Sequence, residues 1–179
     1  YLRRNADAGQ GRWPFWRDLF ARHPVASVLE VGCGSGANAR WFVAPRVYGL
    51  DVNQEALLAA RKNAPRALLV RGEASRLPFP SGSFGLVVAC GLLIHMRPHE
   101  LPKVMDEMYR ASARYLLVLE YHSDQEQEVE YRGLRDALWT RPYQRLFEER
   151  FALLCLERGV LREQGGWEDR RAYWLWEKR

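Results

Sequence analysis

Three glycines and a later aspartate have the spacing of a ligand site. Gly32, Gly34 and Gly36 follow the short apolar run Ser27 to Val31 at alternate positions. Glycines at such a turn let the backbone bend tightly and approach a ligand closely, because they carry no side chain. Asp51 lies about 20 residues after the first glycine, where a carboxylate can accept hydrogen bonds from both hydroxyls of a ribose. The pattern therefore indicates a cofactor that contains a ribose.

The elements that must position these residues alternate between strand and helix. Strands are expected at residues 27–31, 47–50, 68–70, 84–89 and 115–121, and helices at 13–22, 37–43, 54–62, 99–112 and 141–149. Two more strands, at 151–156 and 172–176, flank a turn around Gly165-Gly166. This order predicts an α/β fold: one Rossmann-like, doubly wound sheet of about seven strands, mostly parallel, with an antiparallel C-terminal edge hairpin.

In such a sheet, ligands bind beyond the carboxyl ends of the strands. The glycines follow the first strand, Asp51 ends the second and Glu73 follows the third, so all of them should meet at that edge. The glycines alone leave three interpretations open. They fit a methyltransferase, a turn that only permits tight packing, or an NAD-binding oxidoreductase, because Gly32-x-Gly34-x-x-Ala37 satisfies the relaxed dinucleotide pattern.

The surrounding residues resemble a known family. Val28 to Gly36 resembles motif I of the class I S-adenosyl-L-methionine methyltransferases, and Tyr48 to Asp51 resembles their acidic ribose-binding motif. Gly72-Glu73-Ala74 and Leu77 to Phe84 resemble the adenine-side loop and the lead into strand four. Gly85 departs from the family, which usually has an acidic residue there, and we expect this to alter only a loop contact.

This resemblance implies S-adenosyl-L-methionine as the cofactor, S-adenosyl-L-homocysteine as its product, and no metal. The residues that it assigns to the cofactor are Glu30, Gly32, Gly34, Gly36, Asn38, Asp51, Val52, Glu73, Ala74 and Cys90.

The second half is similar to the pseudaminic acid biosynthesis-associated methylases. The residues that carry this likeness are Arg4-Asn5, Gly91 to Met96, Tyr115 to His122, Glu128 to Gly133, Leu138-Trp139 and Trp174 to Lys178. The resemblance implies a small-molecule methylase linked to nonulosonic-acid or surface-glycan pathways, with an anionic or sugar-derived acceptor.

Methyl transfer is an in-line displacement, for which a protein supplies alignment and, for a hydroxyl acceptor, a base. His95 follows strand four and has a suitable pKa class, and Glu120 ends strand five; these two are the catalytic candidates. His95 could instead hold a loop, and Glu120 could form a salt bridge. The candidates for acceptor binding are Tyr121, His122, Tyr131 and Arg132, and Arg132 could also be one surface arginine among many.

Two other functions are weighed against this one. The net charge of +5 would suit a nucleic-acid methyltransferase, but the arginines are scattered. Residues 90–93 also lack the Asn/Asp-Pro-Pro-Tyr turn of adenine enzymes, and Cys90 lacks the neighbouring proline of cytosine enzymes. An oxidoreductase would need a proton donor, and no Tyr-x-x-x-Lys pair is present. A non-catalytic binding module with the same fold stays open.

Length and composition set the remaining expectations. At 179 residues the chain suits one domain, with residues 1–24 as a helical cap over the cofactor, 25–122 as the cofactor half and 123–179 as the substrate-side half. Three cysteines without C-x-x-C spacing predict reduced thiols in a cytoplasmic protein. No apolar run is long enough for a membrane span, Tyr1 to Asn5 is no apolar leader, and the absence of an initial Met suggests a missing natural start.

Overall fold

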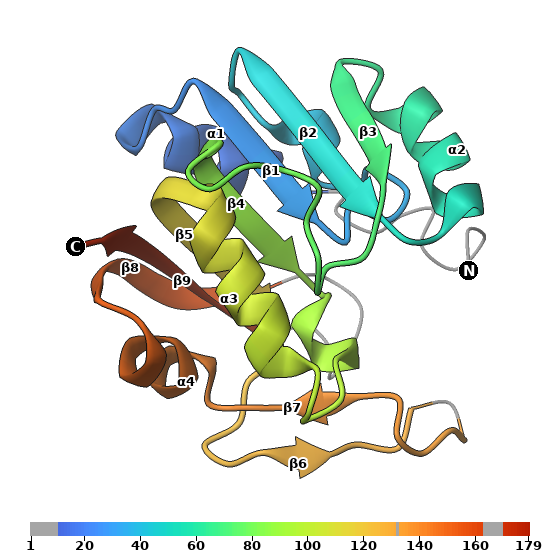
Figure 1. Cartoon of the computed structure of the whole chain (residues 1–179), viewed down its shortest axis with the longest axis vertical. Helices are drawn as coiled ribbons and strands as arrows, with labels where there is room; N and C mark the ends of the chain where they lie inside the picture. Colours follow the sequence, from blue (N-terminus) through green and yellow to red (C-terminus); the bar gives the residue numbers. More distant parts are fainter. Residues whose placement is uncertain (1–10, 132, 163–169) are drawn as a thin grey trace.

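A twisted seven-stranded sheet forms the centre of the molecule, in the order β3-β2-β1-β4-β5-β9-β8 (Figure 1). The computed structural model describes residues 11–131, 133–162 and 170–179. The strands of the sheet are β1 (Ser27–Val31), β2 (Arg46–Asp51), β3 (Ala67–Arg71), β4 (Phe84–Cys90), β5 (Ser112–Glu120), β8 (Leu153–Arg162) and β9 (Arg170–Lys178).

The pairing of the strands confirms the predicted fold class. β3, β2, β1, β4 and β5 pair in parallel, whereas β9 runs antiparallel to both β5 and β8. The chain passes from β1 to β2 on one side and later returns to add β4 on the other side of β1. The strand order therefore reverses beside β1, and the crevice at such a switch point is where open α/β sheets bind ligands.

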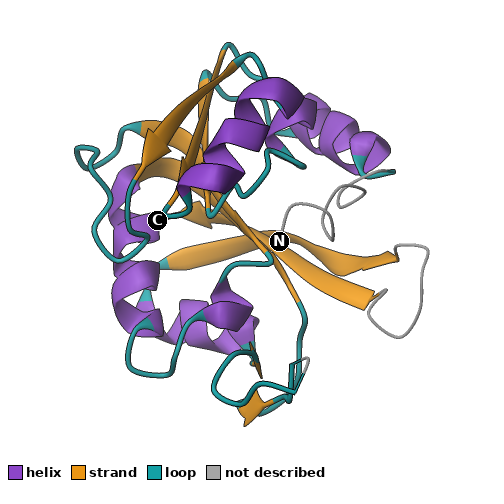
Figure 2. Cartoon of the chain, turned by 90° about the vertical axis from the view of Figure 1, so that its right-hand side faces the viewer, coloured by secondary structure: helices purple, strands orange, loops and turns teal. Residues whose placement is uncertain are grey.

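Helices cover both faces of the sheet (Figure 2). One face packs against α3 (Leu101–Ala111) and α4 (Tyr143–Arg150), and the other packs against α1 (Trp13–Arg22) and the short 3₁₀ turn η2 (Ala39–Trp41). α2 (Gln54–Asn63) lies beside β2 and β3. The helix α3 illustrates the local cause, because its buried residues Leu101, Val104, Met105 and Met108 recur at helical spacing.

The helix predicted at residues 37–43 is wrong. Only the 3₁₀ turn η2 forms there, and Phe42 already has an extended backbone. Gly36 has a φ of +76°, and Pro45 stops any helix before β2 begins at Arg46. The buried side chain of Phe42 packs edge-on against Trp16 of α1, with ring centroids 4.7 Å apart. The short connection therefore follows tertiary packing and not helix propensity.

A second, two-stranded sheet was not predicted. β6 (Gln127–Glu128) pairs antiparallel with β7 (Trp139–Thr140), and Figure 1 shows this pair beyond the carboxyl ends of the parallel strands. We call residues 123–141 the β6–β7 lobe. The short 3₁₀ turn η3 (Leu93–His95) lies between β4 and α3 and contacts β7. The predicted turn at Gly165-Gly166 lies outside the described residues. Within the described residues, no helix is both long and apolar enough to cross a membrane.

Candidate functional site

The glycine loop after β1 has a backbone that requires glycine. Gly32, Gly34 and Gly36 have φ values of +71°, +53° and +76°, a region that other residues rarely adopt. The amides of Gly32 and Cys33 both donate to the carbonyl of Leu50, at 2.7 and 3.0 Å, which fixes the loop to β2. A Cβ on Gly32 would lie only 2.7 Å from Cδ1 of Leu92. The loop is therefore packed on two sides by neighbouring strand ends.

Asp51 joins this loop to the turn after β2. Its Oδ2 accepts a hydrogen bond from the amide of Gly34, and its Oδ1 accepts one from the amide of Asn53, each at 2.8 Å. Each carboxylate oxygen can accept a further hydrogen bond, because each carries two acceptor sites. Two other residues assigned to the cofactor, Val52 and Glu73, are exposed near the same edge, and Ala74 is partly buried.

A buried polar chain lies on the α1 side of the glycine loop. Asn38 donates to Glu30 Oε1 at 2.7 Å, and Arg12 donates to Asn38 Oδ1 at 2.7 Å. Arg12 also donates to the Sγ atom of Cys90 at 3.2 Å. Glu30, Asn38 and Cys90 were assigned from the sequence, and the structure brings them together. Arg12 was missed, since it precedes the apolar pattern of α1 and resembles any other arginine of the chain.

Burial raises the pKa values of two acidic groups in this buried polar network. Glu30 is 1 % exposed, and desolvation raises the pKa of its carboxyl group to about 8, although the Asn38 hydrogen bond opposes the shift. Its Oε2 atom has no hydrogen-bond partner among the described residues. Burial also raises the pKa of the Cys90 thiol, against the charges of Arg12 and Arg171. The site therefore contains a carboxyl group that is largely protonated at neutral pH and an oxygen that a ligand could meet.

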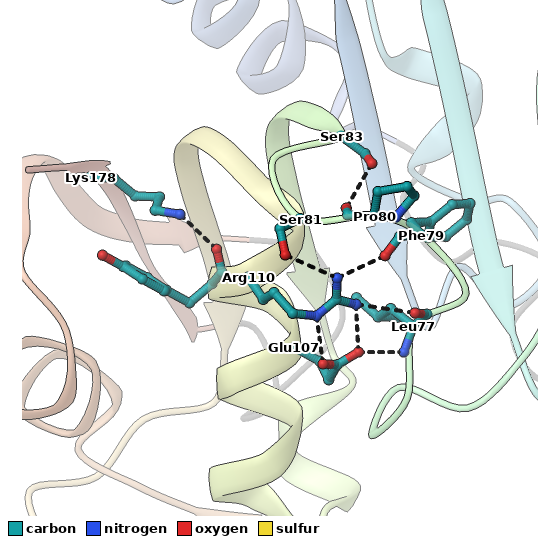
Figure 3. Close-up of polar contacts among 9 residues, drawn as sticks. Leu77, Phe79, Pro80, Ser81, Ser83, Glu107, Arg110 and Lys178 are labelled. Carbon is teal, nitrogen blue, oxygen red and sulfur yellow. Dashed lines mark hydrogen bonds and ion pairs between the residues drawn. The ribbon is translucent and has the colours of Figure 1, made fainter.

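Arg110 of α3 holds the loop that leads into β4 (Figure 3). Its guanidinium donates to the carbonyls of Phe79 and Leu77 at 2.8 and 3.1 Å, and to both carboxylate oxygens of Glu107 at 2.8 Å. Glu107 in turn accepts from the amide of Leu77 at 2.7 Å. The lead into β4 expected from the sequence is thus fixed from α3, which no local pattern predicted.

The structure also accounts for Gly85. A Cβ at this position would lie 3.0 Å from the Cβ of Val25 and 3.4 Å from the carbonyl oxygen of Ser27. The amide of Gly85 donates to the hydroxyl of Ser27 at 3.2 Å. A larger acidic side chain would disturb this contact between β4 and the start of β1. The departure from the family motif therefore concerns strand packing and lies at the amino end of β4.

Glu120 is engaged with the backbone of the turn after β4. Its Oε1 accepts from the amides of Leu92 and Leu93 at 2.8 and 2.7 Å, where η3 begins, and the side chain is completely buried. Burial raises the pKa of this carboxyl group to about 7, against the backbone hydrogen bonds and the charge of Arg171. These contacts give Glu120 a role in shaping the turn. Its catalytic role stays a prediction, and the partners that the described residues give to its Oε1 atom are backbone amides.

His95 links η3 to the β6–β7 lobe. Its Nδ1 lies 2.9 Å from the carbonyl oxygen of Ala137, and its ring lies edge-on to Tyr131 at 5.8 Å. Because a carbonyl can only accept, Nδ1 carries the proton and Nε2 of the neutral ring has a free electron pair. The exposed side chain of His95 can therefore hold the loop and act as a base at the same time.

The remaining acceptor candidates lie apart from one another. His122 is hydrogen-bonded through Nδ1 to the carbonyl of Arg141 at 3.0 Å and contacts Trp174, so it lies on the α4 side. There it lines a hollow of about 370 Å³ together with residues of α4. Tyr121 instead contacts Arg171 of β9. Arg132 lies outside the described residues.

Arg141 is a structural residue that the sequence did not mark. It is completely buried, and it donates to the carbonyls of Leu93 and Met96 at 2.9 and 2.7 Å and to Glu126 at 2.6 Å. These bonds fix η3 to the β6–β7 lobe beside His95. Among the described residues, no group of His, Cys, Asp and Glu side chains could hold a metal ion. The three cysteines are free thiols, as predicted.

Comparisons with known proteins agree with this geometry. Residues 28–114 match the family model described as a methyltransferase domain. The phthiotriol/phenolphthiotriol dimycocerosates methyltransferase 1 of Mycobacterium ulcerans is 40 % identical over 78 residues, which cover 40 % of this chain and 28 % of that protein. The chain spans only about a third or less of the length of the first curated relatives that it matches.

Two solved structures share the fold. An N-methyltransferase of Bradyrhizobium japonicum, in complex with S-adenosyl-L-homocysteine, has a TM-score of 0.74 at 16 % identity over 94 % of this chain and 86 % of that one. The 1,6-didemethyltoxoflavin-N1-methyltransferase of Burkholderia thailandensis has a TM-score of 0.73 at 15 % identity over 96 % and 78 %. Residues 28–114 of this chain are therefore similar to a methyltransferase domain, and the chain has the fold of these two methyltransferases.

Proposed function

We propose that this chain transfers the methyl group of S-adenosyl-L-methionine to a small acceptor by direct in-line displacement. One observation supports the proposal: the Asp51 carboxylate accepts a hydrogen bond from the amide of Gly34, so the two parts of the proposed ribose-binding site meet at the switch point of the sheet. Both residues lie within the part of the chain that matches a methyltransferase domain.

The described residues fit the cofactor. Asp51 would hold the ribose hydroxyls, while Val52, Glu73 and Ala74 would border the adenine. The glycine loop would pass under the amino-acid end, where Glu30 Oε2 is a buried acceptor without a partner among the described residues. An ammonium group beside that oxygen would satisfy it, with Asn38 and Cys90 completing the wall. When bound, the sulfonium supplies an activated methyl carbon.

The residues after β4 and β5 would align the acceptor. Nε2 of His95 has the electron pair needed to remove a proton from a hydroxyl acceptor, since Nδ1 is held by Ala137. Tyr121, Tyr131 and Arg132 would complete the acceptor side of the site. Glu120 would act through the turn at Leu92 and Leu93 that it binds. We divide the chain accordingly into a cap (1–24), a cofactor half (25–122) and an acceptor half (123–179).

We further propose that the acceptor is anionic or sugar-derived. The likeness of the second half to the pseudaminic acid biosynthesis-associated methylases supports this proposal, as does the net charge of +5. The toxoflavin-type methyltransferase with the same fold was crystallised with a small-molecule acceptor, which fits the general size class. A cytoplasmic location is part of the same proposal.

The test has two steps. In a thermal-shift assay, S-adenosyl-L-homocysteine at about 100 times its dissociation constant should stabilise the protein by about 2.7 kcal/mol, and NAD should not. Mass spectrometry should then detect a methylated product after incubation with S-adenosyl-L-methionine and sugar acids or metabolite extracts. Stabilisation by NAD alone would favour an oxidoreductase. Cofactor binding without any methylated product in the whole panel would favour a non-catalytic binding module.

A further inference from the structure

Arg171 lies at the carboxyl ends of β4 and β5. β9 runs antiparallel to β5 and pairs Ala172 with Glu120, so the residue before Ala172 reaches past the carboxyl end of β5. A Cβ on Gly91 would lie 3.5 Å from Nη1 of Arg171, which places the guanidinium above the end of β4 as well. The antiparallel edge strand thus brings a cation from the C-terminal part of the chain to the ligand-binding edge of the parallel strands.

The guanidinium is held in one orientation by Tyr121. Cζ of Arg171 lies 4.8 Å from the centre of the Tyr121 ring, and Nη2 donates to the Tyr121 hydroxyl at 3.2 Å. Stacking and a hydrogen bond together restrict a long side chain before any ligand binds, which reduces the entropy lost on binding.

The local charges favour an anion here. The charge of Arg171 favours the ionised forms of Glu120 and Cys90. The charge of Arg12 favours those of Cys90 and Glu30. Both carboxyl groups are buried, and burial makes their neutral forms more stable. The two arginines therefore bring positive charge to the ends of β1, β4 and β5. Arg12 is bound to the Asn38 chain on the cofactor side, whereas Arg171 faces the end of β5.

We infer that Arg171, supported by Tyr121, binds a carboxylate group of the acceptor. The planar guanidinium matches the two oxygens of a carboxylate in a bidentate pair. This inference rests on the proposed function, because an acceptor exists only if the protein transfers a methyl group. It assigns the anion-binding subsite to a residue of β9.

The same strand pair offers a matched control. Arg114 lies 4.5 Å above the ring of Tyr115 near the amino end of β5, and it is ion-paired with Glu177 of β9 at 2.7 Å. It has the same stacking arrangement but lies at the opposite end of the sheet. An anion that binds arginine–tyrosine pairs without selectivity would affect both positions.

The experiment follows the Nε–Hε signals of the arginines by ¹⁵N NMR. The full chain, saturated with S-adenosyl-L-homocysteine, is titrated with acetate, with glucuronate and with inorganic phosphate. We expect a saturable shift of the Arg171 signal with both carboxylates and no saturable shift of the Arg114 signal. No shift of Arg171, equal shifts at both arginines, or a tighter response to phosphate than to the carboxylates would each overturn the inference.

Variants separate binding from a structural role. Arg171→Gln should weaken glucuronate binding about 10- to 100-fold, since it removes a charged hydrogen-bond donor, and Tyr121→Phe should weaken it less. Arg171→Lys retains the positive charge near Glu120. If Arg171→Gln lowers the melting temperature, Arg171→Lys should therefore restore it. Arg171→Lys should not restore the full affinity for glucuronate. Full recovery of glucuronate affinity in Arg171→Lys would overturn bidentate recognition.

Calorimetry distinguishes this inference from the proposed function. S-adenosyl-L-homocysteine affinity should be unchanged in Arg171→Gln. If it falls as far as in Arg12→Gln, Arg171 belongs to the cofactor site and the assignment to the acceptor is wrong. If the wild type does not bind S-adenosyl-L-homocysteine at all, the proposed function fails. The carboxylate titration of the ligand-free protein then still decides whether Arg171 forms an anion site.

Discussion

The buried carboxyl group of Glu30 should make the stability of the protein depend on pH in an unusual direction. Burial raises its pKa in the folded chain to about 8, against 4.5 for the exposed group. Between these two values the folded state binds more protons than the unfolded state. The free energy of unfolding must therefore fall as the pH rises. The stabilising contribution is fully present below about pH 4.5 and is lost as the pH rises through about 8.

The size of the effect follows from the two pKa values. Between about pH 5 and pH 8.5 the linkage relation gives a loss of about 4 kcal/mol from this one group. Glu30→Gln removes the titration but keeps an oxygen that can accept the Asn38 hydrogen bond. The free energy of unfolding of the wild type, taken relative to that of Glu30→Gln, should therefore be several kcal/mol lower at the higher pH than at the lower pH. Comparing the two proteins cancels the parallel contribution of Glu120.

Urea unfolding at both pH values measures this difference directly. Glu55→Gln serves as the control, because it removes an exposed carboxyl group in the first turn of α2. The difference in stability between this variant and the wild type should hardly change with pH. The reasoning is refuted if the difference between the wild type and Glu30→Gln stays the same, within about 0.5 kcal/mol, at the two pH values. That result would mean that water or a counter-charge reaches the Glu30 carboxyl group.

Three further predictions concern the loops around the site. Arg110→Ala should lower the free energy of urea unfolding by about 2 kcal/mol, because two loop carbonyls lose a charged donor. Arg61→Ala, which changes an exposed arginine, should alter this free energy little. Equal effects of the two substitutions would show that the loop does not need Arg110. Gly34→Val should abolish S-adenosyl-L-homocysteine binding in calorimetry, since a β-branched residue fits poorly at a φ of +53°, and retained affinity would count against the glycine loop. His95→Gln, whose amide can still donate to Ala137, should lower kcat about 10²-fold with an identified hydroxyl acceptor, and a near-normal kcat would remove the role of base.

Local sequence patterns predicted the sheet and the glycine loop well. β1 (Ser27–Val31) and α1 (Trp13–Arg22) have the predicted bounds, since apolar runs and helical spacing are local signals. The fold also brings Gly34 and Asp51 into contact, as expected from the strand ends. The helix at 37–43 failed because Phe42 packs on α1 and Pro45 lies close behind.

The supporting arginines could not be predicted, because their partners are distant in the sequence. Arg141 binds carbonyls of η3, Arg110 binds those of the 77–81 loop, and Arg171 meets Tyr121 across the β5–β9 pair. In a chain with scattered arginines, nothing in composition or spacing marks these positions. The short strands β6 and β7 were not predicted either, because the ion pair of Arg141 with Glu126 that supports them joins residues distant in the sequence.

Calorimetric titration of S-adenosyl-L-homocysteine into the wild type and into Asp51→Ala tests the central claim most directly. The variant loses the carboxylate that would bind two ribose hydroxyls, so its affinity should fall by about 30- to 150-fold, equivalent to about 2–3 kcal/mol. Asn53→Ala removes only the N-terminal cap of α2 and should bind the ligand like the wild type. A wild type that does not bind S-adenosyl-L-homocysteine, or an Asp51→Ala protein that binds it equally well, would contradict the account.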